Sequence, residues 1–263
     1  MAGDESKSIV LAIGAHPDDV ELGCAGTLAL LRDQGWSVVI ASLTPGDKGS
    51  NRLSPDDISR IRRQEAKESA ALIEATYYCL EWRDLAVFYG DMSCKRTTAL
   101  IRAVDPTLVF THATRDYLGD HEETSRIVRH ACFAAPVRNY EVPAFPERDT
   151  PEPTSAIPHL YYYDPIEGID IFGQPAPASV IVDITETVDL KERMLAKHES
   201  QRAWLRQHHG TEDALQQMRL WSKARGKQID REYGEAFRQH VGHAFPREDL
   251  LSGVLGERVE LID

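Results

Sequence analysis

Short apolar runs alternate regularly with helical segments along the first half of the chain, and two more apolar runs follow. An apolar run of about four to eight residues between turn residues predicts a buried strand, and a longer amphipathic segment predicts a helix. Strands are predicted at residues 8–13, 37–44, 77–82, 107–112, 159–163 and 179–184. Helices are predicted at residues 25–31, 54–72, 97–104 and 121–134, and from 187 onward. This alternation predicts βαβ units with right-handed crossovers, and hence an α/β, Rossmann-like fold whose mostly parallel sheet is flanked by helices.

The pattern becomes less regular in the second half of the chain. Residues 139–158 are rich in Pro, Glu and Thr, which predicts a surface loop or lid, and this segment and residues 164–178 are expected to shape a pocket. Beyond residue 187 the chain looks helical to about His240. We therefore expect a single domain over residues 1–263, with a core at about 8–205 and a helical C-terminal extension at about 206–263.

The net charge of −12 over 263 residues limits the classes of partner. An acidic chain is poorly suited to the phosphate backbone of a nucleic acid, so we expect a small neutral or cationic substrate, or one met through a metal. No apolar run approaches the roughly 18 residues that span a bilayer, and residues 1–7 lack the apolar core of a signal peptide. A cytoplasmic protein without a membrane span is expected, whose C-terminal helices could supply the contacts of a homo-oligomer.

The four cysteines are widely spaced, at Cys24, Cys79, Cys94 and Cys132. The absence of a Cys-x-x-Cys pair argues against a zinc ribbon, and the spacing gives no disulfide framework. Reduced, mostly buried thiols are expected, with Cys24 as a small packing residue.

The turn after the first predicted strand gathers an imidazole and several carboxylates. His16, Asp18, Asp19 and Glu21 follow the strand directly and precede a helix. In open α/β sheets, ligands bind at the carboxyl ends of strands, and carboxylates this close repel one another unless a cation lies among them. The turn therefore predicts a divalent metal site with one carboxylate left over for chemistry. The same acids exclude a dinucleotide site, because they would repel a pyrophosphate.

A third protein ligand is expected in the loop that follows the fourth predicted strand. This loop, residues 111–123, also leaves the carboxyl end of a strand, so it can face the first turn. His121 stands at the start of the next helix with Asp120 before it, which makes His121 the best candidate ligand.

These motifs resemble those of the LmbE-like, or PIG-L, family of zinc-dependent N-deacetylases. The first motif is the most specific part of the resemblance, and the others follow it in the family's order between residue 9 and about residue 201. The matching segments are His16-Pro17-Asp18-Asp19-Val20-Glu21 with Gly23 and Gly26-Thr27, then Arg62-Arg63-Gln64-Glu65-Ala66, Asp120-His121 and Lys197-His198-Glu199-Ser200-Gln201.

The resemblance implies a zinc ion held by His16, Asp19 and His121, with Asp18 as the general base. A site with three protein ligands keeps a position open and lowers the pKa of a bound water toward about 7. His198 would donate to the tetrahedral oxyanion. The family also implies a small N-acetylated amino sugar, or a glycoconjugate carrying one, as the substrate.

One departure from the family concerns the segment Leu118-Gly119-Asp120-His121. Many members have His-Pro-Asp-His here, so the first His of that motif is replaced by Leu118. His112 and Asp116 are candidates to take its place beside the substrate, and Asp120 is expected to orient a ligand imidazole.

Arg62 has two possible roles. Its helix also carries Arg60, Arg63 and Lys67, so a solvated charged face is one interpretation, and contact with the substrate or an anion is the other.

Two other groups of residues could belong to a site, but packing is the favoured interpretation for both. The pairs His208-His209 and His240/His243 lack a Cys or acidic partner at ligand spacing, which favours surface or packing roles. A second group consists of aromatic residues and the pair His208-His209. It could line a sugar pocket or form the interface where the C-terminal helices pack on the domain, and the packing interface is favoured. The aromatic residues are Trp204, Trp221 and Tyr233.

Two alternative functions remain open. The same metal and Asp18 could cleave an amide in a larger N-acyl substrate or a thiol conjugate, with pocket size deciding. A metal- or ligand-binding protein without turnover is disfavoured, because Asp18 would then have no task.

Overall fold

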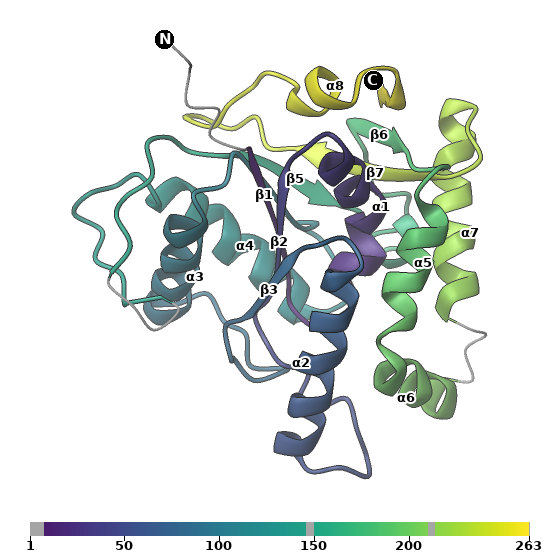
Figure 1. The fold of residues 1–263 in the computed structure, drawn as a ribbon, viewed down its shortest axis with the longest axis horizontal. Helices are drawn as coiled ribbons and strands as arrows, with labels where there is room; N and C mark the ends of the chain where they lie inside the picture. The colour runs from purple at the N-terminus through teal and green to yellow at the C-terminus, as the bar shows by residue number, and fades with distance from the viewer. Residues whose placement is uncertain (1–7, 146–149, 210–213, 263) are drawn as a thin grey trace.

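The computed structural model describes residues 8–145, 150–209 and 214–262, and these residues form one eight-stranded sheet with helices on both faces (Figure 1). The strands are β1 (Ile9–Gly14), β2 (Ser37–Ser42), β3 (Thr76–Cys79), β4 (Leu108–His112), β5 (His159–Tyr163), β6 (Val180–Asp183), β7 (Gly234–Gln239) and β8 (Val259–Leu261). The helices are α1 (Asp19–Asp33), α2 (Pro55–Ala71), α3 (Asp91–Val104), α4 (Gly119–Ala134), α5 (Val188–Ala196), α6 (Glu199–His209), α7 (Ala214–Gly226) and α8 (Leu250–Leu255).

The order of the strands places a switch point at β1. The sheet runs β3-β2-β1-β4-β5-β7-β6-β8, so the chain leaves β1 toward β2 on one side and returns to β4 on the other. Neighbouring strands pair in parallel from one edge inward, through β3, β2, β1, β4 and β5. The remaining pairs are antiparallel: β7 with β5, β7 with β6, and β8 with β6. The predicted α/β fold is confirmed. Ligands bind where strand order reverses in such sheets, so the ends of β1 and β4 are the natural place for a site.

Alternate residues of β1 supply two separate apolar cores. Val10 and Ala12 pack on the face covered by α1, whereas Leu11 and Ile13 pack on the face covered by α3 and α4 (Figure 1). Side chains of a strand point alternately to its two faces, so a strand buried on both sides is apolar throughout. This burial makes β1 a rigid support for the turn that follows it.

The prediction of a helical C-terminal extension is wrong in one respect. Helix α7 is present, but Gly234–Gln239 forms β7, which lies inside the sheet between β5 and β6, and Val259–Leu261 forms β8 at its edge. The segment Gly-Glu-Ala-Phe-Arg-Gln lacks an apolar run, because its second residue is the buried acid Glu235. The C-terminal part of the chain therefore completes the sheet that the first half begins.

Helix α1 begins at Asp19, earlier than the predicted start at residue 25. Its first turn carries Asp19 and Glu21, and negative side chains are favoured there by the partial positive charge of a helix N-terminus. The motif predicted as a turn is thus partly helical. Within the described residues, none of the helices combines the length and apolar character needed to cross a bilayer.

The close approach of α1 to the end of β6 leads to a stability prediction. A Cβ at Gly26 would lie 2.9 Å from the Cβ and Cγ2 atoms of Ile184, which is buried. We expect Gly26→Ala to lower the free energy of unfolding by about 1–3 kcal/mol, because packed atoms must shift. Urea unfolding measures this change.

A matched control is Gly253→Ala in α8, where an added Cβ meets nothing within 4 Å. This variant should be as stable as the wild type or up to about 1 kcal/mol more stable, since Ala favours a helix. A Gly26→Ala protein as stable as the wild type would contradict the packing described here.

Candidate metal centre

His16, Asp19 and His121 come together at the carboxyl ends of β1 and β4. His16 lies in the turn after β1, Asp19 opens α1 and His121 lies in the first turn of α4. Nδ1 of His16 is 3.4 Å from Oδ2 of Asp19, and Nε2 of His121 is 3.4 Å from Oδ1 of Asp19. One ligand atom from each of the three residues lies within 4.8 Å of the others, so this triad could hold a metal ion.

A carboxylate holds the outer nitrogen of each imidazole in this triad. Oδ2 of Asp120 is 3.2 Å from Nε2 of His16, and Oδ1 of Asp116 is 3.0 Å from Nδ1 of His121. Asp120 in turn accepts a hydrogen bond of 2.6 Å from the backbone N–H of Leu85. Carboxylates placed in this way fix the rotation of a ligand ring and leave its inner nitrogen for a metal.

His112, the last residue of β4, contacts two members of the triad, Asp19 and His121. Its Nε2 lies 3.0 Å from Oδ2 of Asp19 and 3.0 Å from the backbone nitrogen of Ala15. Its ring stacks on that of His121, with 3.9 Å between centroids. His112 and Asp116 were predicted to contact substrate; both line the cavity described below, and their contacts here orient Asp19 and His121.

The charges of the triad depend on one another. Burial alone would lower the pKa of His16 and His121, but the carboxylates of Asp120, Asp19 and Asp116 outweigh burial and raise these values to about 9 and about 10. Burial raises the pKa of Asp19, but His121 and His112 hold it well below its ordinary value. The carboxylates thus require positive charge between them, and a divalent cation meets that requirement.

Asp18 stands apart from the triad although it precedes Asp19 in the chain. Its backbone φ of 106° is in the left-handed region, an uncommon and strained conformation for a residue other than glycine. Its Oδ1 lies 3.3 Å from Nη2 of Arg62. Burial raises the pKa of Asp18 to about 6, against the opposing charge of Arg62. One carboxylate of the motif therefore joins the triad and the other remains outside it.

Arg62 is buried beneath this turn, with 2% of its surface exposed, so it does not belong to a solvated charged face. Its Nη2 donates to the carbonyl of Pro17 at 2.7 Å, and its Nη1 lies 3.5 Å from the carbonyl of Gly46. A Cβ at Gly46 would lie 2.4 Å from the guanidinium, so the loop can cover Arg62 only with glycine there. These contacts position Asp18, and the predicted contact with substrate stays a prediction.

His198 lies beside Glu21, at the break between α5 and α6. Its Nε2 is 3.0 Å from Oε1 of Glu21, which also accepts a hydrogen bond of 2.6 Å from the hydroxyl of Ser69. The ring is 1% exposed, and His198 is not among the residues that line the cavity. This placement favours a role in positioning over the predicted donation to an oxyanion.

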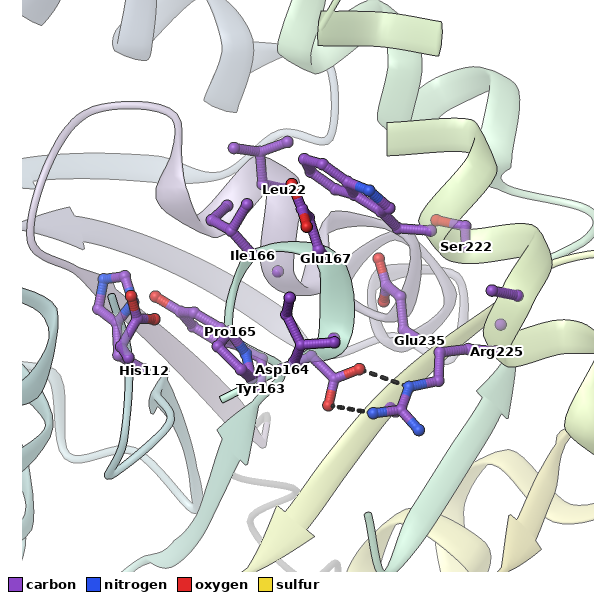
Figure 2. Close-up of a pocket in the computed structure, with 18 of the residues that line it drawn as sticks. Leu22, His112, Tyr163, Asp164, Pro165, Ile166, Glu167, Ser222, Arg225 and Glu235 are labelled. Atoms are coloured by element: carbon purple, nitrogen blue, oxygen red, sulfur yellow. Dashed lines mark hydrogen bonds and ion pairs between the residues drawn. The ribbon is translucent and has the colours of Figure 1, made fainter. Parts of the chain in front are cut away.

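A cavity of about 240 Å³ leads away from the triad. Asp19, His112 and His121 line the part next to the triad. Arg225 and Glu235 line the opposite part, together with Lys191, which is bonded to Glu235, and Trp221, which precedes Ser222 on α7. Figure 2 shows His112 at one side and Ser222 and Arg225 at the opposite side, with Glu235 beside them. Part of the segment 164–178 lines the cavity, as predicted, whereas the described residues of 139–158 do not.

The aromatic and histidine clusters of the C-terminal part have separate locations. Trp221 lines the cavity rather than forming only a packing interface, whereas Tyr233 lies beneath Arg219. His240 packs on Phe245 and lies 3.0 Å from the hydroxyl of Tyr162, the packing role expected for it. The side chains of His208 and His209 lie outside the described part of the structure.

Lys191 and Glu235 were not predicted from the sequence as residues of the cavity. Both line the cavity, and both lie in segments that look like ordinary amphipathic surface elements. The burial of a charged residue cannot be recognised from its neighbours in the sequence, because its partner comes from a distant segment.

A family model described as PIG-L, GlcNAc-PI de-N-acetylase, matches residues 11–132, which contain every residue of the triad. Residues 11–132 of the chain are therefore similar to the PIG-L family. This family, which is also called LmbE-like, is one of metal-dependent N-deacetylases. A mostly buried His/Asp triad at the end of β1 agrees with that similarity.

Two relatives of this chain are named for the same sugar. Diacetylchitobiose deacetylase of Thermococcus kodakarensis is 27% identical over 198 residues, covering 73% of this chain and 69% of the relative. The solved N,N'-diacetylchitobiose deacetylase of Pyrococcus horikoshii, complexed with its inhibitor MPG, superposes with a TM-score of 0.75 at 26% identity, over 93% of this chain and 89% of that chain.

A further relative catalyses a different reaction. The 4-oxalmesaconate hydratase of Pseudomonas putida is 22% identical over 189 residues, covering 69% of this chain and 69% of the relative. Similar folds can therefore serve different chemistry, so the reaction has to be argued from the site.

The geometry of the triad predicts graded losses of metal affinity. Asp19→Ala should bind zinc at least about a hundredfold more weakly, because it removes a ligand. Asp116→Asn should bind zinc about 10–100-fold more weakly, because it releases the outer nitrogen of His121. Competition with a chromophoric chelator measures both affinities.

The matched control is Asp18→Asn, which changes the neighbouring carboxylate and should keep the wild-type affinity for zinc. Equal zinc affinity in Asp19→Ala and the wild type would exclude the triad as the metal centre.

Proposed function

We propose that this protein is a zinc-dependent hydrolase that removes an N-acetyl group from a small N-acetylated amino sugar or glycoconjugate. The products are acetate and the free amine. The observation that carries this proposal is the division of the motif, in which Asp19 joins two oriented imidazoles while Asp18 stays outside them beside Arg62. The names of the two relatives at 27% and 26% identity support an N-acetylated sugar as the substrate class.

His16, Asp19 and His121 would hold the zinc ion. Two imidazoles and one carboxylate suit zinc and leave a position open. When bound, the metal supplies Lewis acidity, which polarises the acetyl carbonyl and makes a water molecule acidic near neutral pH. The protein's contribution is to fix the ligands, through Asp120, Asp116 and His112, before substrate arrives.

Asp18 moves the proton in this proposal. Its carboxylate accepts a proton from the attacking water as the new C–O bond forms, and returns that proton to the amine nitrogen as the C–N bond breaks. Arg62 holds the carboxylate through the 3.3 Å contact and thereby sets its direction. We assign His198 a positioning role, because its imidazole pairs with Glu21 one turn further along α1.

The alternative of an amidase acting on a larger N-acyl or thiol-conjugate substrate would use the same groups. It differs in the acyl chain that must fit beside the triad, so a series of acyl lengths separates the two functions. A binding protein without turnover is disfavoured, because Asp18 would then have no proton to transfer.

Acetate release tests the proposed reaction. The zinc-loaded wild type should release acetate from N-acetylglucosamine or N,N'-diacetylchitobiose, and removal of zinc with a chelator should abolish the release. Asp18→Asn should lower kcat by about 10²–10⁴-fold, because it removes the group that transfers the proton.

Zinc content measured on the same samples must be equal in the variant and the wild type. Wild-type activity in Asp18→Asn would remove Asp18 from the mechanism. No acetate from either sugar, with release of a longer acid from an N-acyl substrate, would favour the amidase.

A further inference from the structure

The end of the cavity away from the triad is built by the C-terminal half of the chain. Lys191 comes from α5, Trp221 and Arg225 from α7, and Glu235 from β7. The 3₁₀ turn Ile166–Gly168 covers this end from the other side (Figure 2). Because the same cavity reaches Asp19 and His121, a substrate bound at the triad extends toward these residues.

The buried cations at this end are already neutralised by the protein. Nζ of Lys191 donates to Oε1 of Glu235 at 2.7 Å, and Nε and Nη2 of Arg225 donate to the carboxylate of Asp164 at 2.6 and 3.0 Å. Glu167 adds a further carboxylate to the lining. A phosphate or carboxylate placed here would meet the carboxylates of Glu235, Asp164 and Glu167, while the cations Lys191 and Arg225 are already paired with the first two. An anionic group is therefore repelled.

The same wall suits an uncharged group that is rich in hydroxyls. The ammonium of Lys191 has three N–H donors, and the bond to Glu235 uses one of them. Ser222 and Gln228 add a hydroxyl and an amide to the lining, and Trp221 adds an aromatic surface. Pockets that combine an aromatic face with a few fixed polar groups select a ligand by shape and hydrogen bonding.

Arg225 also fixes the width of this part of the cavity. Arg225 binds Asp164 (Figure 2), and its Nη2 also donates to the carbonyl of Ala176 at 2.9 Å. One side chain thus ties both ends of the loop 164–176 to α7. Within the loop, the backbone N–H of Asp170 donates to the carbonyl of Gln174 at 2.8 Å. The loop 164–176 and helix α7, which line the cavity from two sides, are thus held at a fixed distance before a ligand enters.

We propose that this end of the cavity is a subsite for a neutral sugar ring attached to the N-acetylated residue, and that it excludes conjugates carrying an anion there. Trp221 provides the face on which the ring lies, and Lys191 donates to its hydroxyls. This inference rests on the proposed function and names its substrate class: neutral N-acetylated oligosaccharides rather than sugar phosphates or acidic glycosides.

Steady-state kinetics of acetate release test the subsite with three substrates. These are N-acetylglucosamine, neutral N,N'-diacetylchitobiose, and N-acetylglucosamine 1-phosphate, which places an anion where the second sugar would lie. The wild type should have at least about tenfold higher kcat/KM for the disaccharide than for the phosphate. Trp221→Ala should raise KM for the disaccharide about tenfold and should affect the monosaccharide less.

Two further variants make the result specific. Leu220→Ala changes a half-exposed neighbour on α7 that does not line the cavity, so it should keep the wild-type ratios. Glu167→Gln removes one exposed carboxylate and should raise kcat/KM for the phosphate relative to the disaccharide, a gain that misfolding cannot produce.

The outcomes separate the subsite from the reaction. Two results would overturn the subsite alone. One is a kcat/KM of the wild type for the phosphate that equals or exceeds its kcat/KM for the disaccharide. The other is an unchanged ratio of kcat/KM between disaccharide and monosaccharide in Trp221→Ala. No acetate release by the wild type from any of the three sugars would overturn the proposed function and the subsite with it.

Discussion

The carboxylate of Asp19 is the group on which the arrangement of the candidate centre depends. Its two oxygens contact three imidazoles, those of His16 at 3.4 Å, His112 at 3.0 Å and His121 at 3.4 Å. These rings come from the end of β1, the end of β4 and the start of α4, so the triad forms only when the parallel pairing of β1 with β4 is in register. The N-terminus of α1 adds partial positive charge at the same carboxylate. Fold and site are therefore linked through one side chain.

The sequence allowed the parallel half of the fold and the heart of the site to be predicted. Strands β1 and β4 are buried on both faces, so they appear as apolar runs that periodicity detects directly. His16, Asp18 and Asp19 share one turn, so their chemistry is visible without any knowledge of the fold. His121 required more, because its approach to Asp19 follows from strand pairing and from the resemblance to a family.

Other features could not be predicted because their causes lie far apart in the chain. Arg62 looks like its neighbours Arg60 and Arg63 in the sequence, yet it alone is fully buried, since the partners that stabilise its charge come from the first turn and a distant loop. Lys191 and Glu235 form a buried pair across α5 and β7, and β7 itself has no apolar run. A sequence displays charges but not the contacts that permit their burial.

The two ends of the cavity come from different parts of the chain, and this division has an evolutionary consequence. The family model covers residues 11–132, which carry the triad and Asp18, whereas the opposite wall is made by residues between 164 and 236. Substitutions in the later segment can change which molecule fits the cavity without disturbing the candidate metal ligands. Evolutionary change confined to residues 164–236 therefore reshapes the opposite wall of the cavity while the His/Asp triad stays as it is.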